Sequence, residues 1–341
     1  MKKLVFALLF IQLFTFSAIL AARPENKAIT EFIDSLISLQ HKPGEPGGAL
    51  AVIMGEKILY QKTFGMMDIE QNVEVSSTTL FDLASMAKHF TAYAVLLLEE
   101  EGIIDLDEDI RTYMPDLPEY EQRITTRNLL QHTSGIASTD WLRLIADLPL
   151  DMEWSHQDEI DLIKKYQQLN FPPNTEFIYS NGGYSILASI VESVTGEYFP
   201  DFVNSRIFGP LGMKHSLIYT GHHLSGKDIA KGYARSGSEF RFVSSVNDFS
   251  YGSGNIYSNL DDMVLWGRNL LSPVIGSKEM AQRMLTRYNT LENGDTIGYT
   301  YGLYVREHRG IKMANHSGGM PGFRSLITIF PDEDLLIVSM L

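Results

Sequence analysis

The pattern of apolar and polar positions predicts strands near both ends of the chain and helices between them. An amphipathic helix is expected over 26–41, where apolar residues recur at helical period. Two strands follow at 49–54 and 57–64, and Gly55-Glu56 between them favours a hairpin turn. The apolar segment from Ser85 to Glu101, rich in alanine and leucine, predicts a long helix.

The middle of the chain, from 103 to about 287, is dominated by helical patterns separated by loops that contain proline and glycine. The helices predicted there cover residues 126–131, 156–168, 183–195 and 261–271. This stretch is therefore expected to form a mostly helical region.

The C-terminal stretch returns to strand patterns, with turns at Arg309-Gly310 and Pro331-Asp332. The predicted strands cover residues 301–307, 311–316, 323–330 and 335–340. Strands at both ends predict one antiparallel sheet built from about 48–66 and 299–341, flanked by helices, with the helical region inserted. The fold class is α+β. Because the apolar run at 335–341 stops in mid-strand, a further C-terminal element is expected to cover one face of the sheet.

The first 22 residues predict a secretory signal peptide, since Lys2 and Lys3 precede an apolar run that ends at Ala21-Ala22. An uncleaved membrane anchor is the alternative. Residues 23–341 are expected to form one domain. The 341 residues include no cysteine, which excludes disulfides and thiolate metal sites. An exported chain of this kind is expected in the bacterial envelope, periplasmic or secreted.

The formal net charge of −14 disfavours nucleic acids and anionic membranes as partners, because both would repel such a chain. The expected partner is a small-molecule or peptide substrate with an ester or amide bond. The oligomeric state stays open.

Ser85 and Lys88 lie three residues apart at the start of a predicted helix and so share one face of it. A serine hydroxyl becomes a nucleophile when a base takes its proton, and a lysine can do this if burial lowers its pKa. The helix N-terminus would also point N–H groups at an oxyanion. The alternative is that Ser85 merely caps the helix and Lys88 lies in solvent.

Tyr-x-Asn occurs twice. Tyr179-Ser180-Asn181 lies in a predicted loop before an apolar helix, where catalytic side chains are common. Tyr257-Ser258-Asn259 directly precedes the helix at 261–271, so its polar residues are expected to cap that helix. The first copy is therefore the functional candidate.

His-x-Gly also occurs twice. His308-Arg309-Gly310 falls in the predicted hairpin turn, which explains its glycine. His316-Ser317-Gly318 ends a predicted strand and leads into Gly319, and glycines there would let a substrate approach the backbone. The alternative for His316 is an exposed histidine at a strand end.

In this order, the three motifs resemble the serine β-lactamase and penicillin-binding-protein superfamily. The chain looks most like the class C β-lactamase branch, which also contains esterases, D-aminopeptidases and DD-peptidases. The resemblance covers about 28–341, and the run from Ile124 to Gly135 also matches. It implies a β-lactamase/transpeptidase-like fold and a serine hydrolase that cleaves an ester or a D-residue amide through an acylated Ser85.

The resemblance also implies roles for single residues. Ser85 would be the nucleophile, Lys88 would hold its proton network, and Tyr179 would act as general base and acid with a pKa lowered by nearby cations. Backbone N–H groups of Ser85 and Gly319 would form the oxyanion hole. Substrate binding would fall to Asn181, His316, Ser317, Gly318 and Gly319. The segment His132-Thr133-Ser134-Gly135 would be a structural helix end.

One departure weighs against a true β-lactamase. The third motif is usually Lys-Thr-Gly in that group, and the charge of its lysine helps to hold the β-lactam carboxylate. The histidine found here is mostly neutral at pH 7. Two alternatives stay open beside the hydrolase: a β-lactamase, and a penicillin-binding or sensor protein with the same fold that turns over slowly or not at all.

Other mechanisms lack their motifs. Gly-x-Ser-x-Gly and His-Glu-x-x-His are absent, and His222-His223 has no carboxylates at ligand spacing. The expected mechanism needs neither a metal nor an organic cofactor.

Overall fold

The computed structural model describes residues 24–149, 152–221, 228–243, 248–286 and 289–341, so the predicted signal peptide lies outside the described residues. The chain divides after Gln40 into two compact units, within the stretch predicted as one domain. Helix α1 (Pro24–Gln40) is the described part of the first unit and matches the helix predicted over 26–41. None of the described helices has the length and apolar character needed to cross a bilayer.

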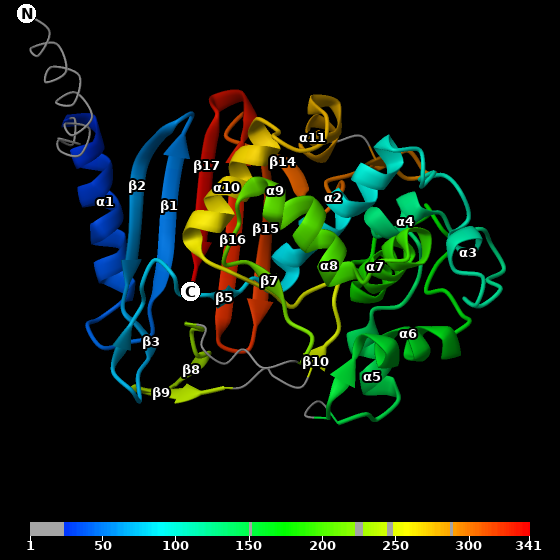
Figure 1. The fold of residues 1–341 in the computed structure, drawn as a ribbon, viewed down its shortest axis with the longest axis horizontal. Coiled ribbons are helices and arrows are strands. Elements are labelled where there is room, and N and C mark those ends of the chain that lie inside the picture. The colour runs from blue at the N-terminus through cyan, green and yellow to red at the C-terminus, as the bar shows by residue number, and fades with distance from the viewer. Residues whose placement is uncertain (1–23, 150–151, 222–227, 244–247, 287–288) are drawn as a thin grey trace, which may run out of the picture. The chain divides into compact units, whose positions relative to one another are not determined.

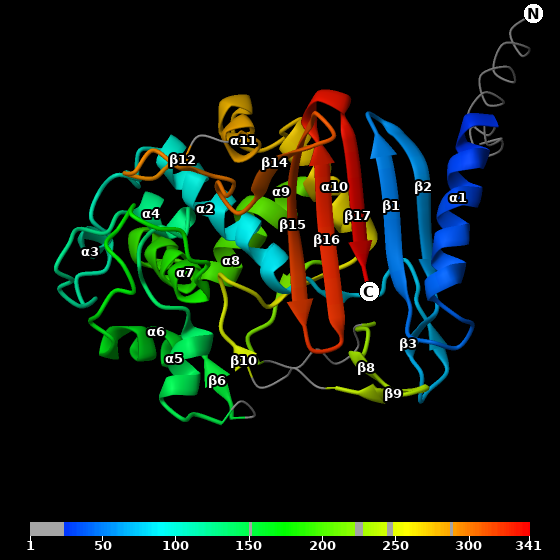
Figure 2. The ribbon, with the colours of Figure 1, turned by 180° about the vertical axis from the view of Figure 1, so that it is seen from behind.

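The second unit, from His41 onward, contains a six-stranded antiparallel sheet in the order β14-β15-β16-β17-β1-β2 (Figures 1 and 2). Its strands are β1 (Gly48–Met54), β2 (Lys57–Phe64), β14 (Tyr304–His308), β15 (Ile311–Met320), β16 (Phe323–Phe330) and β17 (Leu335–Met340). Because β17 pairs with β1, segments from the two ends of the sequence meet inside one sheet. The α+β class and the predicted sheet are confirmed.

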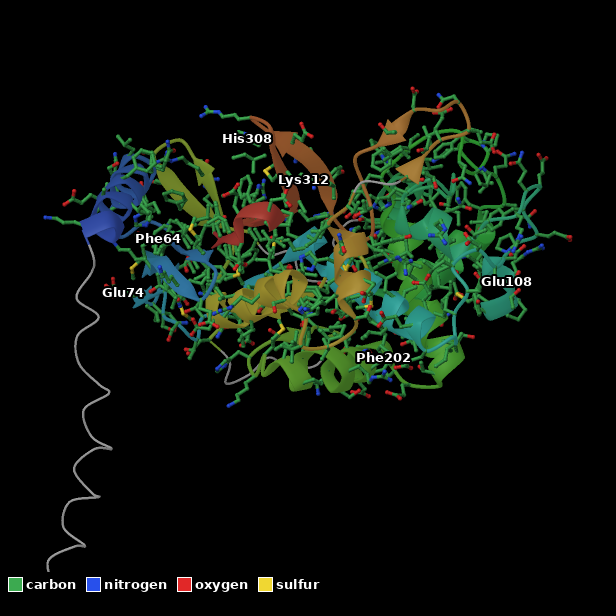
Figure 3. All side chains as sticks on the ribbon, turned by 90° about the horizontal axis from the view of Figure 1, so that it is seen from above. Phe64, Glu74, Glu108, Phe202, His308 and Lys312 are labelled. Atoms are coloured by element: carbon green, nitrogen blue, oxygen red, sulfur yellow. The ribbon has the colours of Figure 1, made fainter. Side chains whose placement is uncertain are left out.

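Local sequence explains the β14–β15 hairpin. Arg309 and Gly310 both have positive φ, 52° and 82°, as a two-residue type I′ turn requires. His308 is the last residue of β14 before this turn, and Lys312 lies in β15, paired with Glu307 (Figure 3). Strand β15 runs to Met320, four residues beyond the predicted strand end, because it pairs with β16 along its whole length from Ala314.

The longest elements in the connection between the two parts of the sheet are helices. The α-helices are α2 (Ala87–Glu100), α3 (Ile110–Tyr113), α4 (Thr126–Leu130), α5 (Thr139–Ile145), α6 (His156–Lys165), α7 (Asn181–Thr195), α8 (Phe199–Val203), α9 (Gly209–Leu211), α10 (Leu260–Leu271) and α11 (Lys278–Met284). Single-turn 3-10 or π segments are η1 (Ala84–Met86), η2 (Asn204–Phe208) and η3 (Pro331–Glu333). All four helices predicted in this region are present with small shifts at their ends.

The same region also contains short strands that the sequence did not predict. The short strands of the second unit are β3 (Met66–Asp68), β4 (Val73–Glu74), β5 (Phe81–Asp82), β6 (Trp154–Ser155), β7 (Leu217–Ile218), β8 (Tyr233–Ser236), β9 (Glu239–Phe242), β10 (Asp248–Phe249), β11 (Ile256–Ser258), β12 (Asn289–Thr290) and β13 (Thr296–Ile297). Strands of two to four residues are too short to show a recognisable alternation.

Helix α2 forms the centre of the core. All its residues from Ala87 to Leu98 are buried, and it packs against α7. Helix α10 packs on one face of the sheet, against β17 and β1 (Figure 1). The N-terminal end of α2 is thereby held next to β15, through η1.

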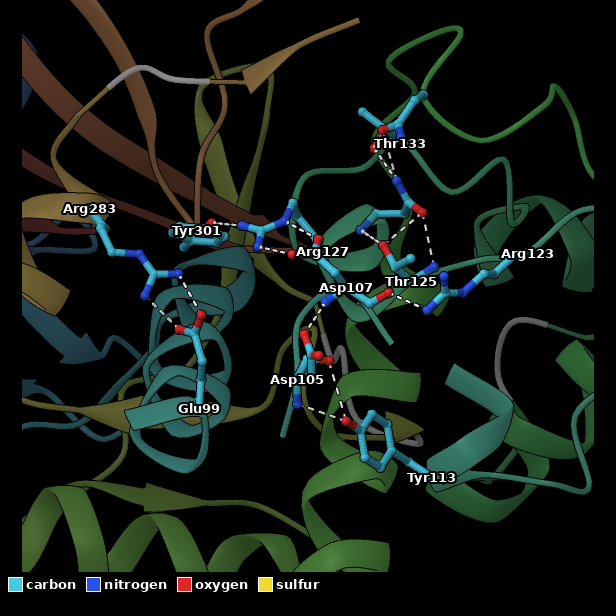
Figure 4. Close-up of polar contacts among 12 residues, drawn as sticks. Glu99, Asp105, Asp107, Tyr113, Arg123, Thr125, Arg127, Thr133, Arg283 and Tyr301 are labelled. Carbon is cyan, nitrogen blue, oxygen red and sulfur yellow. Dashed lines mark hydrogen bonds and ion pairs between the residues drawn. The ribbon is translucent and has the colours of Figure 1, made fainter. Parts of the chain in front are cut away.

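A polar network ties the helical region to the segment that enters β14 (Figure 4). Arg127 of α4 donates to both carboxylate oxygens of Asp107, at 2.7 and 2.8 Å, and to Tyr301 Oη at 2.6 Å. Arg283 of α11 makes a similar bidentate pair with Glu99 of α2, at 2.6 and 2.9 Å. Paired contacts of this kind fix orientation as well as adding energy.

Candidate active site

Ser85 lies on a strained turn. It belongs to η1, which continues directly into α2. The preceding Ala84 has a φ of 48°, a left-handed value that costs energy for a residue with a Cβ, and its N–H donates to Asp82 Oδ1 at 2.8 Å. Neither η1 nor α2 has a side-chain cap at its N-terminus, so the alternative of Ser85 as a helix cap is wrong.

Lys88 is fully buried, and the alternative of a solvated lysine is therefore also wrong. Its Nζ donates to Asn181 Oδ1 at 2.7 Å and to the Ser253 carbonyl at 2.8 Å. Ser85 Oγ lies 3.4 Å from the same Nζ. The lysine thus joins the first two predicted motifs at one point.

Burial lowers the pKa of Lys88 from 10.5 to about 7, because the charged form loses its hydration. The charges of Asp140 and Glu159 oppose this shift. A large fraction of Lys88 is therefore neutral near pH 7 and able to accept a proton.

Tyr179 lies in the loop directly before α7, as predicted. Lys88 Nζ is 4.8 Å from the centroid of its ring. Burial raises the pKa of Tyr179 well above its usual value, although Ser85 opposes the shift. The expectation of a lowered pKa is wrong, because burial of the phenol disfavours its charged form. The Oη atom is buried and makes no hydrogen bond within the described part of the chain.

The first turn of α7 presents Asn181. Ser180 caps the helix by accepting from the Gly183 N–H. The Asn181 N–H donates to Ser138 Oγ at 3.2 Å, and its side-chain Nδ2 donates to Asp140 Oδ2 at 2.6 Å. Asp140 therefore fixes which end of the Asn181 side-chain amide faces Lys88, and Ser138 holds the backbone of Asn181. Neither residue was singled out from the sequence.

Glu159 is a buried carboxylate behind the site that the sequence also did not reveal. It accepts from Thr139 Oγ1 at 2.8 Å, Ser185 Oγ at 2.6 Å and Trp154 Nε1 at 3.1 Å. Burial raises its pKa. These bonds join α5, α6, α7 and β6 and so hold the elements that carry Asp140 and Asn181.

His132, expected at a structural helix end, lies at that end and also contacts residues of the site. Helix α4 ends at Leu130, and His132 follows with a φ of 57°. Its Nδ1 accepts from the Ser180 N–H at 3.1 Å, so the neutral ring carries its proton on Nε2. The ring lies 4.3 Å from that of Tyr179. No sequence pattern revealed this role, because the contact with Ser180 spans 48 residues.

His316 lies inside β15 and is 2% exposed, so the alternative of an exposed strand-end histidine is wrong. Its Nδ1 donates to the Ser317 carbonyl at 2.7 Å, and its Nε2 accepts from Tyr299 Oη at 3.2 Å. Burial lowers the pKa of His316 to about 3, with a smaller effect from Lys88. His316 is therefore neutral, and both its nitrogens are engaged within the protein. The neighbouring Ser317 side chain is exposed.

Gly318 allows β15 to approach the turn that carries Ser85. A Cβ at this position would lie 2.1 Å from the Leu83 carbonyl oxygen and 2.2 Å from Ser325 Oγ. Strand β14 pairs with β15 only as far as Asn315, so the edge that includes Gly318 and Gly319 is free of β14. This edge faces η1.

The second copies of the Tyr-x-Asn and His-x-Gly motifs lie at the helix start and the hairpin turn predicted for them. Asn259 caps α10 by accepting from the Asp262 N–H, which confirms its structural role. His308 ends β14 at the hairpin turn. His222-His223 lies outside the described residues, and no cluster of metal-ligating side chains occurs in the part that the structure describes.

Comparisons with known proteins identify a matching family and similar proteins. A family model described as Beta-lactamase matches residues 26–341. A penicillin-binding protein of Bacillus subtilis is 30% identical over 303 residues, which cover 84% of this chain and 66% of that protein. A D-aminopeptidase of Brucella anthropi is 27% identical over 304 residues, covering 88% and 56%. The chain thus spans between about half and two thirds of the length of these curated relatives.

Among solved structures, the D-amino acid amidase of Ochrobactrum anthropi SV3, complexed with L-phenylalanine amide, is similar with a TM-score of 0.77 at 25% identity. The similarity covers 93% of this chain and 91% of that one. The family model matches nearly all of the chain. The chain therefore belongs to the β-lactamase family, within the superfamily of serine β-lactamases and penicillin-binding proteins.

Proposed function

We propose that this chain is a serine hydrolase that cleaves an ester or a D-residue amide through an acylated Ser85. The observation that carries the proposal is the buried Lys88, whose pKa is lowered to about 7 and whose Nζ lies 3.4 Å from Ser85 Oγ. A base with a pKa near the working pH is the most effective. Relatives named D-aminopeptidase and D-amino acid amidase support the choice of substrate.

In the proposed reaction, Ser85 Oγ attacks the substrate carbonyl while its proton passes to neutral Lys88. The N–H groups of Ser85 and Gly319 stabilise the oxyanion. Collapse of the tetrahedral intermediate breaks the bond to the leaving group, which takes a proton from Tyr179, and Lys88 returns the proton to Tyr179. Water then attacks the acyl-enzyme and its proton passes to Lys88, which restores Ser85 as the acid is released.

The third motif favours this reaction over β-lactam hydrolysis. A β-lactam carries a carboxylate, for which the lysine of the usual Lys-Thr-Gly motif supplies a charge. His316 is neutral and buried and has both nitrogens engaged, so it supplies none. The composition of residues 1–22 supports export to the cell envelope as part of the proposal.

The direct test is hydrolysis by the purified protein of four substrates: p-nitrophenyl acetate, the D and L enantiomers of phenylalanine p-nitroanilide, and nitrocefin. We expect turnover of the ester, a preference for the D-anilide over the L-anilide, and no change of nitrocefin. A folded protein that hydrolyses neither the ester nor the D-anilide contradicts the proposal. Nitrocefin turnover at a comparable rate would instead make the protein a β-lactamase.

The pH dependence should report the ionisation of Lys88. Since the pKa of Lys88 is about 7, kcat/KM should rise through a single ionisation with a midpoint near pH 7 and level off above it. His316 does not interfere, because its pKa is lowered to about 3. The measurement is the ester rate from pH 5 to 9. A rate that is still rising at pH 9 would contradict a base whose pKa is about 7.

A further inference from the structure

We propose that Asp140 binds an ammonium group of the substrate, so that the enzyme selects substrates with an unblocked amine next to the scissile carbonyl. This inference rests on the proposed function and names the substrate class of that site. Asp140 lies in the first turn of α5 and is exposed. It makes no ion pair with any residue that the structure describes.

Short contacts join Asp140 to the nucleophile. Asp140 Oδ2 lies 2.6 Å from Asn181 Nδ2, Asn181 Oδ1 lies 2.7 Å from Lys88 Nζ, and Lys88 Nζ lies 3.4 Å from Ser85 Oγ. The side chains of Asn181 and Lys88 therefore lie between the Asp140 carboxylate and the Ser85 hydroxyl. An α-amine is two bonds from the scissile carbonyl carbon, so a substrate acylating Ser85 holds its amine close to the same surface.

Among the described residues, only Oδ2 of Asp140 accepts hydrogen bonds. Oδ2 accepts from Asn181 and, at 3.3 Å, from Ser138 Oγ. Oδ1 accepts no hydrogen bond from the described residues. A carboxylate has about four lone-pair sites, so Oδ1 remains available to an ammonium donor.

The charges around Ser85 favour a cation over an anion. Lys88 is buried with a lowered pKa, His316 and His132 are held neutral by burial, and Asp140 is the exposed charge in this set of contacts. The charge of Asp140 acts on both Lys88 and Tyr179. A bound ammonium would pair with Asp140 and would also favour the neutral form of Lys88, which the reaction requires.

A purely structural role for Asp140 would be to orient Asn181 and to stabilise the first turn of α5. The two roles differ in a measurable way. Loss of orientation slows every substrate to a similar degree, whereas loss of an ion pair slows only substrates that carry the amine. The ratio of kcat/KM between matched substrates therefore separates them.

The experiment compares D-phenylalanine p-nitroanilide with its N-acetyl derivative, which lacks the charge. The wild type should prefer the unblocked anilide. In Asp140→Asn, where the amide oxygen can still accept from Asn181, this preference should fall roughly ten- to hundredfold, as expected for one lost charged hydrogen bond, mainly through a higher KM. Asp140→Glu should recover part of the preference.

Asp147→Asn is the matched control, because Asp147 follows the other end of α5, is exposed, and has a φ of 52° that asparagine tolerates. Its preference should equal that of the wild type. Three results would overturn this inference and leave the hydrolase in place. The first is that the wild type hydrolyses the two anilides at equal rates, and the second is that it hydrolyses neither although it takes up a fluorophosphonate at Ser85. The third is that the preference is unchanged in Asp140→Asn. Absence of that adduct would overturn the hydrolase itself.

Discussion

Ser85→Ala is expected to lose all acyl transfer and all labelling by a fluorophosphonate. The probe phosphonylates the serine oxygen and releases fluoride, and alanine has no atom that can form this bond. Intact-mass measurement should show one adduct on the wild type and none on the variant. A lost nucleophile leaves only the residual rate that binding and the oxyanion site supply.

The control for this variant is Ser272→Ala. Ser272 is an exposed residue at the C-terminal end of α10, away from the predicted motifs. It should take up the probe as the wild type does, and circular dichroism should show the same fold for all three proteins. An adduct or ester turnover that persists in Ser85→Ala would eliminate the proposed mechanism.

Lys88→Met should have the second largest effect. Methionine fills a similar volume but has no basic atom, so Ser85 loses the group proposed to accept its proton. We expect kcat for the ester to fall by about 10²- to 10⁴-fold, the usual contribution of a positioned general base. Labelling of Ser85 should slow in parallel.

Two further measurements make this result specific. Removal of Nζ leaves Asn181 Oδ1 and the Ser253 carbonyl without this donor, at a cost to stability of about 1–3 kcal/mol each, so thermal unfolding must be followed to show that the variant is folded at the assay temperature. Lys312→Met, at a lysine whose side chain is 63% exposed, should keep full activity. A folded Lys88→Met with wild-type kcat would exclude lysine as the base.

Elements with a clear apolar period were predictable from the sequence. The hairpin of β1 and β2, the strands β14 to β17 and helices such as α2 and α7 follow their patterns closely. The Arg309-Gly310 turn was predictable because a two-residue hairpin turn requires positive φ, which glycine adopts easily. The two-residue strands β5 and β10 were not, since their pairing depends on partners distant in the chain.

The residues of the site also divide into those that the sequence predicts and those that it does not. Ser85, Lys88, Tyr179 and Asn181 stand in short motifs with a chemical reason for their spacing, and the structure brings them together. Asp140 and Glu159 carry no such spacing, because their importance comes from burial, exposure and contacts made across the fold. The direction of the Tyr179 pKa shift was predicted wrongly for a related reason. A sequence shows which charged residues exist, but it does not show that burial of the phenol disfavours its ionised form.

The pairing of β1 with β17 has a consequence for how the protein is made. During synthesis β1 and β2 emerge long before β17, the strand that pairs with β1 in the same sheet. Until then the β1 edge presents unpaired backbone groups, which is a risk for aggregation. Closing the sheet requires contacts between segments that are far apart in the sequence, which predicts slow folding.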